Sequence, residues 1–196
     1  MSVIDNLIYD RTQADVDRVS TLTVKILTGG LSSLTDEEKE EYLAGMKGAY
    51  NYTDLNRVGQ AVTYIASRMI NLPDELRTYM ENNQVASASI YVLPYDPAEV
   101  VVTPKTDWVI SDIPVKSQID TYLSNLRTLK GILELPETAP EVPTSLDKLG
   151  YETANNIEEL LAIINTTLSA VENHYYDLIN NTISAFKYCG DEHCGN

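Results

Sequence analysis

The chain has 196 residues, 43% hydrophobic and 22% charged, a composition typical of a folded protein with one core, alone or with an appendage. Its formal net charge is −15 and its 14 Lys and Arg residues are scattered singly, so a surface that follows nucleic-acid phosphates or adheres to an anionic membrane is disfavoured. No stretch approaches the roughly 20 apolar residues of a membrane span, and residues 1–10 lack the features of a signal peptide, so we expect a protein made in a reducing cytosol that binds neither nucleic acid nor membrane.

Two helices are expected near the N-terminus. Thr12 with Asp15 three residues later resembles a capping box, and the apolar pattern that follows predicts a first helix over residues 12–28. Thr35 and Glu38 form a second capping box, which predicts a short helix. The residues of this second helix expected to face inward are Tyr42, Leu43 and Met46.

The stretch 45–58 predicts a stiff, aromatic hinge ahead of a long helix. We expect Thr53 to be the N-cap, with Asp54 in the first turn beside the positive end of the helix dipole. The amide of Asn51 is expected to fasten the backbone of the turn between two packed rings. The hinge residues are Tyr50, Asn51, Tyr52, Thr53, Asp54, Asn56 and Arg57.

The helix that follows the hinge is expected over residues 53–71. Its apolar stripe recurs at steps of three and four and consists of Leu55, Val58, Val62, Ile65 and Met69. Asn56 and Arg57 are expected to fasten it to the first helix, where Asp15 and Asp17 offer acidic partners. The hinge is therefore predicted to be structural rather than catalytic.

The chain changes in character after this helix. Pro73 predicts the start of a separate short helix that ends at residues 82–83. Residues 85–113 contain β-branched and aromatic runs broken by prolines, which indicates a short extended or β excursion with one hairpin at most. Because such runs leave backbone groups without partners, we expect another chain to complete them by strand addition. The candidate interface residues are Ile90, Tyr91, Val92, Tyr95, Val101 and Trp108.

The second half of the chain predicts two more amphipathic helices, over residues 115–134 and 152–174, joined by an acidic proline-rich linker at 136–144. The residues after 174 predict a flexible tail, in which the helix could continue. The expected fold is mainly α, a bundle of about four long amphipathic helices at shallow crossing angles. Its regions are an N-terminal helical region (1–84), the excursion (85–113), a C-terminal helical region (114–174) and the tail (175–196).

No motif for catalysis or for a cofactor is found. Cys189, His193 and Cys194 are ligand types that suit zinc, but a fourth ligand is missing and the only other histidine is His174. The carboxylates at 36–38 are explained by capping of a helix start. We therefore expect no metal, no cofactor and no enzymatic activity.

A resemblance adds a functional expectation. Residues 47–58, with the sequence KGAYNYTDLNRV, resemble a signature in tail-module structural proteins of phages and prophages of Gram-positive bacteria. Residues 10–17, 106–108, 112–114 and 151–158 agree with it. The resemblance implies a non-enzymatic structural subunit of a phage tail, at the baseplate, tail tip or fibre attachment. Its expected partners are other tail subunits and copies of itself, and its expected location is the virion after assembly in the host cytoplasm.

Two other classes of function stay open at this point. A carbohydrate-binding module for host recognition would use exposed aromatic side chains, for which Tyr91, Tyr95 and Trp108 are the candidates. A small metal- or redox-active protein would use Cys189 and Cys194. A glycan array would test the first of these functions, and metal analysis of the purified protein would test the second.

Overall fold

A computed structural model describes residues 2–85, 92–147 and 149–190, the last six of them through their backbone alone. The described chain is mainly helical, as expected, and contains five α-helices and no β-strand. The α-helices are α1 (Gln13–Gly29), α2 (Asp36–Ala44), α3 (Tyr52–Asn82), α4 (Lys116–Ile132) and α5 (Tyr151–Gly190). Three short 3₁₀ turns, η1 (Val3–Asn6), η2 (Leu31–Ser33) and η3 (Pro97–Glu99), accompany them.

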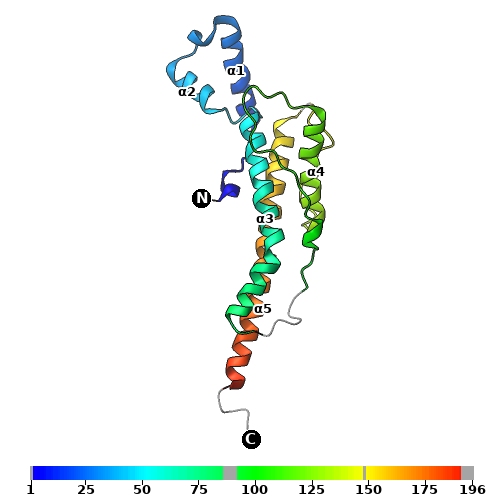
Figure 1. Cartoon of the computed structure of the whole chain (residues 1–196). Coiled ribbons are helices and arrows are strands. Elements are labelled where there is room, and N and C mark those ends of the chain that lie inside the picture. The colour runs from blue at the N-terminus through cyan, green and yellow to red at the C-terminus, as the bar shows by residue number, and fades with distance from the viewer. Residues whose placement is uncertain (1, 86–91, 148, 191–196) are drawn as a thin grey trace.

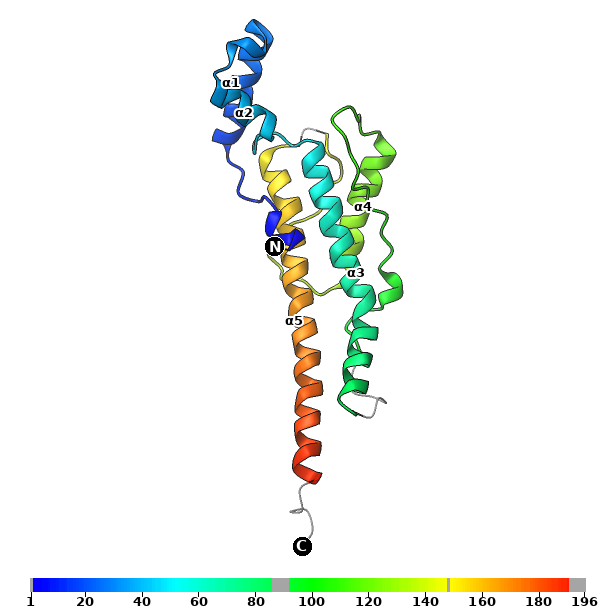
Figure 2. The same ribbon diagram turned by 60° about the vertical axis from the view of Figure 1, so that its left-hand side comes forward.

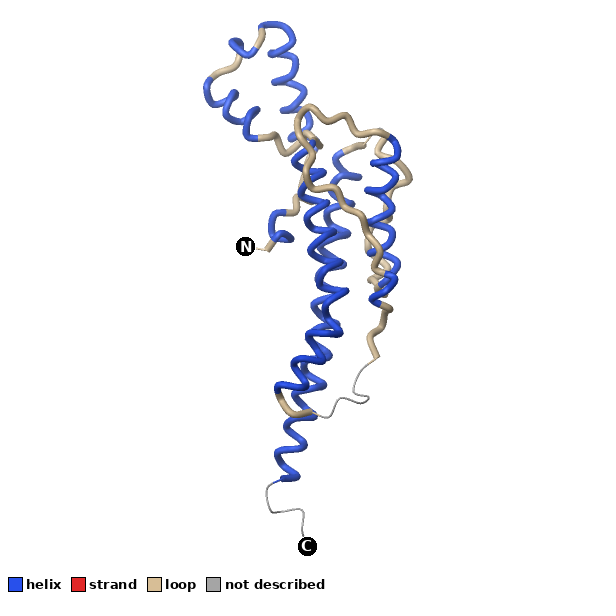
Figure 3. The backbone as a smooth tube through the Cα atoms, viewed as in Figure 1, coloured by secondary structure: helices blue, strands red, loops and turns tan. Residues whose placement is uncertain are grey.

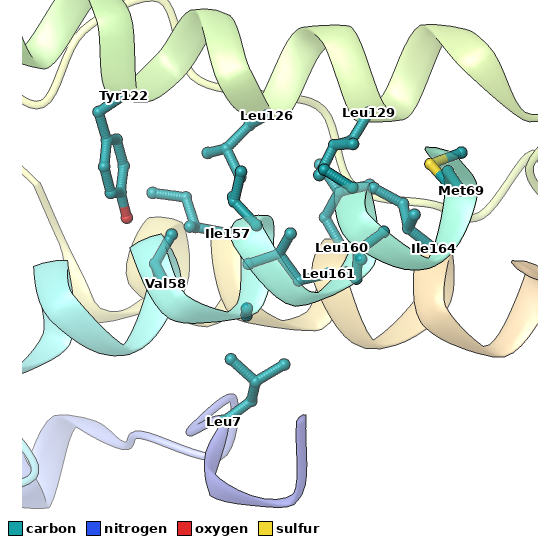
Figure 4. Packing of buried hydrophobic residues seen from close by; sticks show 14 of the residues in the cluster. Leu7, Val58, Met69, Tyr122, Leu126, Leu129, Ile157, Leu160, Leu161 and Ile164 are labelled. Carbon is teal, nitrogen blue, oxygen red and sulfur yellow. The ribbon is translucent and has the colours of Figure 1, made fainter. Parts of the chain in front are cut away.

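Three helices, α3, α4 and α5, lie side by side and run in the same direction (Figures 1 and 2). Figure 4 shows this directly, because residue numbers rise the same way from Val58 to Met69, from Tyr122 to Leu129 and from Ile157 to Ile164. The contacts agree: Arg57 bonds Glu158 and Tyr79 bonds Asn180, and both pairs are 101 residues apart. The core is thus a parallel three-helix bundle. The expected bundle of four long helices is not confirmed.

Parallel helices require the chain to return to its starting end twice, and the described parts of these returns, residues 92–115 and 133–147, contain no α-helix (Figure 3). The 17 residues of α4 are about 26 Å long, whereas the segment 133–150 could span about 60 Å when extended. The described part of the other return, residues 92–115, runs along α3 and α4 without forming a strand. The expected β excursion is therefore not confirmed.

The bundle encloses one continuous apolar core (Figure 4), onto which Leu7 of the N-terminal segment also packs. Its fully buried side chains include Ile65, Met69, Leu123, Leu126, Leu129, Ile157, Leu160, Leu161 and Ile164. Each of these is worth about 1.5–3 kcal/mol when buried. The periodic stripes that predicted α3, α4 and α5 are the faces that form this core.

The helix predicted to end before Pro73 instead continues through it, so the separate short helix expected there is part of α3. A second apolar cluster explains this: Leu72 and Leu76, on either side of the proline, are fully buried against Tyr175 and Ile179 of α5. A proline inside a helix costs about 3 kcal/mol. Burial of two leucines at about 1.5–3 kcal/mol each outweighs that cost.

The same cluster corrects the expected C-terminal tail. The last helix does not end at residue 174 but continues as α5 to Gly190, because its contacts with α3 reach Ile179. Residues 191–196, with His193 and Cys194, lie outside the described residues, and so does the side chain of Cys189.

Helices α1 and α2 form a hairpin that stands at the end of the bundle where α3, α4 and α5 begin (Figures 1 and 2). Leu22, Leu34 and Met46 bury a small core between them. Tyr42 and Leu43, expected to face inward, are exposed. Glu38 and Glu41 of α2 instead face α1, where they pair with Arg18 and Lys25.

Candidate functional site

The hinge caps α3 two residues earlier than expected. Asn51, not Thr53, is the N-cap, because its Oδ1 accepts from the Thr53 N–H at 2.8 Å while its own N–H donates to Asp54 Oδ2 at 2.8 Å. The Thr53 hydroxyl donates to the same Asn51 oxygen at 2.7 Å. The helix therefore begins at Tyr52, which is partly exposed.

A buried ionic cluster lies below this cap. Arg11, Asp54 and Glu158 are nearly inaccessible, and Arg57 closes the cluster from α3. Arg11 Nη2 donates to Asp54 Oδ1 at 2.8 Å and to Glu158 Oε1 at 2.6 Å. Arg57 Nε donates to Glu158 Oε2 at 2.8 Å, and its Nη2 donates to Asp54. Two cations balance two carboxylates, so the cluster is neutral and hydrogen-bonded, as burial requires.

This cluster replaces the contacts expected for Arg57. Arg57 meets Glu158 of α5 rather than Asp15 or Asp17, because the parallel course of α3 and α5 brings Glu158 alongside. Asp15 instead accepts the N–H and hydroxyl of the cap residue Thr12, and Asp17 accepts from a side chain of α1 itself. The cluster ties the N-terminal segment to two helices, and both of its carboxylates accept hydrogen bonds from Arg11 and Arg57.

Tyr50 connects this ionic cluster to α4. Its hydroxyl shares a hydrogen bond with the hydroxyl of Tyr122, and the Arg11 guanidinium lies 5.5 Å from the centre of its ring. Burial raises the pKa of both phenols well above the usual range. Both therefore stay neutral, and the pair links the hinge to the bundle.

Residues 100–108, which we call the strap, cross α3 in extended form. Asn56 holds one end: its Nδ2 donates to the Trp108 carbonyl at 2.9 Å, and its Oδ1 accepts from the Trp108 N–H at 2.7 Å. Asn125 of α4 holds the other end by accepting from the Thr103 N–H at 2.9 Å. A methyl group at Gly59 would overlap the Lys105 carbonyl. Two asparagine side chains thus supply hydrogen bonds that a neighbouring strand would supply in a sheet, and Gly59 leaves room for the strap to approach α3.

A groove of about 310 Å³ lies between the strap, α3 and α4. Its lining residues are Val58, Gly59, Val62, Thr103, Pro104, Lys105, Trp108, Ser117, Gln118, Thr121, Tyr122 and Asn125. Trp108 is only 4% exposed, and its Nε1 has no hydrogen-bond partner among the described residues. The Lys105 ammonium lies 4.8 Å from the centre of the Trp108 ring and pairs with Asp107 at 2.6 Å.

The candidate interface residues divide into three groups. Tyr95 and Trp108 are buried in the chain's own core, so they are not available as exposed contacts. Val92 and Val101 are 89% and 71% exposed, so they are accessible to a partner. Ile90 and Tyr91 lie outside the described residues.

Exposed apolar side chains occur close together in the loop before α4, which lies at the end of the bundle where α3 and α4 begin (Figure 1). We call this loop the apolar end; its exposed apolar residues are Val109, Ile110, Ile113 and Val115. The hairpin also exposes Val24, Leu27, Leu31, Tyr42 and Leu43. Ile110 and Ile113 are each 86% exposed. Val109, Ile110 and Ile113 lie in the excursion (85–113) that was expected to be completed by another chain, but they were not among its candidate interface residues.

Comparisons with known proteins identify no relative. No family model matches the chain, and neither a curated protein nor a solved structure matches it. In the described part of the chain no helix has the length and apolar character needed to cross a bilayer. The described residues also contain no group of three or more His, Cys, Asp or Glu side chains placed to hold a metal ion.

Proposed function

We propose that this chain is a non-enzymatic structural subunit of the tail of a phage or phage-like particle, placed at the baseplate, tail tip or fibre attachment. The observation that carries the proposal is the apolar end. Monomeric proteins rarely expose large apolar side chains together, and such patches mark binding surfaces. An assembly subunit that is made separately and then docks on a neighbour needs a surface of this kind.

The charges near the apolar end favour another protein over a second copy as the docking partner. The hairpin carries more carboxylates than cations: Asp15, Asp17, Asp36, Glu37, Glu38, Glu40 and Glu41 against Arg18, Lys25 and Lys39. Two copies that met through this end would bring like charges together. A neighbouring tail subunit with an apolar centre and a basic rim fits better.

The resemblance gives independent support. The segments that carry the resemblance are far apart in sequence, yet they supply the four residues that meet in the ionic cluster. Arg11 lies in the first segment, Asp54 and Arg57 in the second, and Glu158 in the last. Trp108, from another segment, is held by Asn56. The resemblance therefore rests on residues that maintain this fold, as expected for a shared structural role.

The alternatives gain no comparable support. Two of the three aromatic residues proposed for carbohydrate binding, Tyr95 and Trp108, are buried and offer no exposed platform. The cysteines of the metal or redox alternative belong to the part of the chain whose side chains are not described.

Particles from a bacterium that encodes the chain provide the test. We expect an antibody against the chain to label tails in electron micrographs. The double variant Ile110→Ser/Ile113→Ser should fold with wild-type helicity yet enter particles roughly tenfold less, in line with the loss of about 1.4 kcal/mol or more of docking energy. Ile70→Ser, a matched control on the exposed face of α3, should enter normally. Unlabelled tails, or normal entry of the double variant, would contradict the proposal.

A further inference from the structure

The strap offers hydrogen-bond donors that the chain itself does not use. The backbone N–H groups of Val102, Lys105 and Thr106 donate to no atom of the described residues. Trp108 Nε1 is a buried donor without a partner, which is uncommon, since buried polar groups are nearly always hydrogen-bonded. Donors in an extended segment beside a groove are the arrangement that accepts an added strand.

The groove next to the strap has an apolar floor and a polar rim. Val58 and Val62 of α3 form the floor, and both are almost completely buried. Hydroxyl and amide side chains of Thr103, Gln118 and Thr121 surround the opening. A volume of about 310 Å³ lies at the lower limit of small-ligand sites, so it suits one apolar side chain rather than a large ligand.

The electrostatics disfavour a charged occupant. Among the described residues Lys105 is the only cation that lines the groove, and it pairs with Asp107 at 2.6 Å and lies 3.8 Å from Asp112. A ligand carboxylate would have to compete with both. The unused donors instead call for neutral acceptors spaced along an extended chain, which are peptide carbonyls.

We propose that the groove binds an extended peptide segment of a partner protein. One apolar side chain of the peptide enters the groove between Thr103, Gln118 and Thr121. The backbone carbonyls of the peptide accept from strap N–H groups and from Trp108 Nε1. Because Nε1 is enclosed, a carbonyl reaches it only after a small movement of the indole or of the strap. The proposal does not depend on the tail assignment, since any peptide-binding protein could use such a groove.

The only tryptophan of the chain makes the site directly observable. The ¹H–¹⁵N spectrum of the full chain contains one indole signal, that of Trp108. Titration with acetyl-Thr-Leu-Thr-amide should shift this signal and the Val102 and Thr106 amide signals saturably. Toluene probes the apolar volume alone, and methyl β-D-glucoside probes a carbohydrate site. No saturable shift with the peptide, or an equal or larger shift with toluene or the glucoside, would overturn the proposal.

Two variants on α4 locate the binding. Thr121→Tyr fills the groove and should weaken peptide affinity roughly tenfold or more. Ser124→Tyr adds the same side chain at an exposed position of α4 outside the groove and should leave the affinity unchanged. Gln118→Phe replaces Thr121→Tyr if that variant loses the wild-type spectrum. Equal affinity of the filled-groove variant and the wild type would place the peptide elsewhere and refute the proposal.

Discussion

Tyr95 compensates for Pro73: its hydroxyl donates to the Met69 carbonyl at 3.1 Å. In a regular helix that carbonyl accepts from the N–H four residues later, which here is position 73. Proline has no N–H, so Met69 would lack its helical donor. The residue expected to contact a partner chain thus stabilises the interior of α3, and burial raises the pKa of its phenol to about 12.

This relationship predicts a coupling between the two positions. Tyr95→Phe should lower the free energy of unfolding by about 1–3 kcal/mol, because it leaves the buried Met69 carbonyl without a partner. In a Pro73→Ala background the restored N–H supplies that partner, so the same change should cost clearly less. Denaturant unfolding of the four proteins measures the difference. Equal costs in both backgrounds would show that the hydroxyl does not replace the missing donor.

The ionic cluster predicts that removal of one of its charges strongly destabilises the protein. Glu158→Gln should destabilise the protein by about 3–5 kcal/mol, because Arg11 and Arg57 would then face one carboxylate in a buried site. Asp74→Asn is the matched control: it breaks an exposed ion pair with Arg77, and such pairs contribute about 0–1 kcal/mol. Thermal and denaturant unfolding give both values. Similar small losses for the two variants would mean that the cluster contributes little.

The helix cap predicts a difference between neighbouring positions. Asn51→Ala should cost about 0.5–2 kcal/mol, since Asn51 satisfies the first turn of α3. Thr53→Ala should cost less, because Thr53 lies inside the helix and is exposed. Urea unfolding of both variants checks the order. The reverse order would restore Thr53 as the cap.

How much the sequence predicted depends on how local each signal is. The capping boxes of Thr12 and Thr35 need only four residues of sequence each, and both are confirmed. The stripes that predicted the long helices are local as well. The end of a helix at Pro73 was wrong, because the local cost of proline is outweighed by leucines that pack against α5, about 100 residues away.

In the candidate site, too, the sequence predicted local features but not contacts between distant residues. Asn56 and Arg57 were singled out as polar residues behind a cap, but the partners predicted for them were wrong, because the observed partners, Trp108 and Glu158, lie 52 and 101 residues away. Only the parallel arrangement of α3 and α5 makes the second pair possible. The direction of a helix after an 18-residue connection is not encoded locally, since such a length permits either direction.

Acid should loosen the hairpin before it affects the bundle. The bond from Lys25 is the main cause that lowers the pKa of Glu38, and the bond from Arg18 does the same for Glu41. Carboxylates with a lowered pKa in the folded state stabilise it above their unfolded pKa of about 4.5, and this contribution is lost as the pH falls through the folded pKa. Asp15 and Asp36, whose pKa values are lowered by bonds from Thr12 and Lys39, act in the same direction.

Hydrogen exchange of backbone amides measures this loosening. Between pH 6 and pH 3, after correction for intrinsic rates, protection of α1 and α2 amides should fall while that of core α3 amides near Ile65 changes less. Arg18→Met with Lys25→Met should remove much of the pH dependence, because both partners of the carboxylates are gone. Lys116→Met, which breaks an exposed pair on α4, is the control and should leave it intact. The interpretation fails if hairpin protection is the same at both pH values, or if the double variant keeps the wild-type profile.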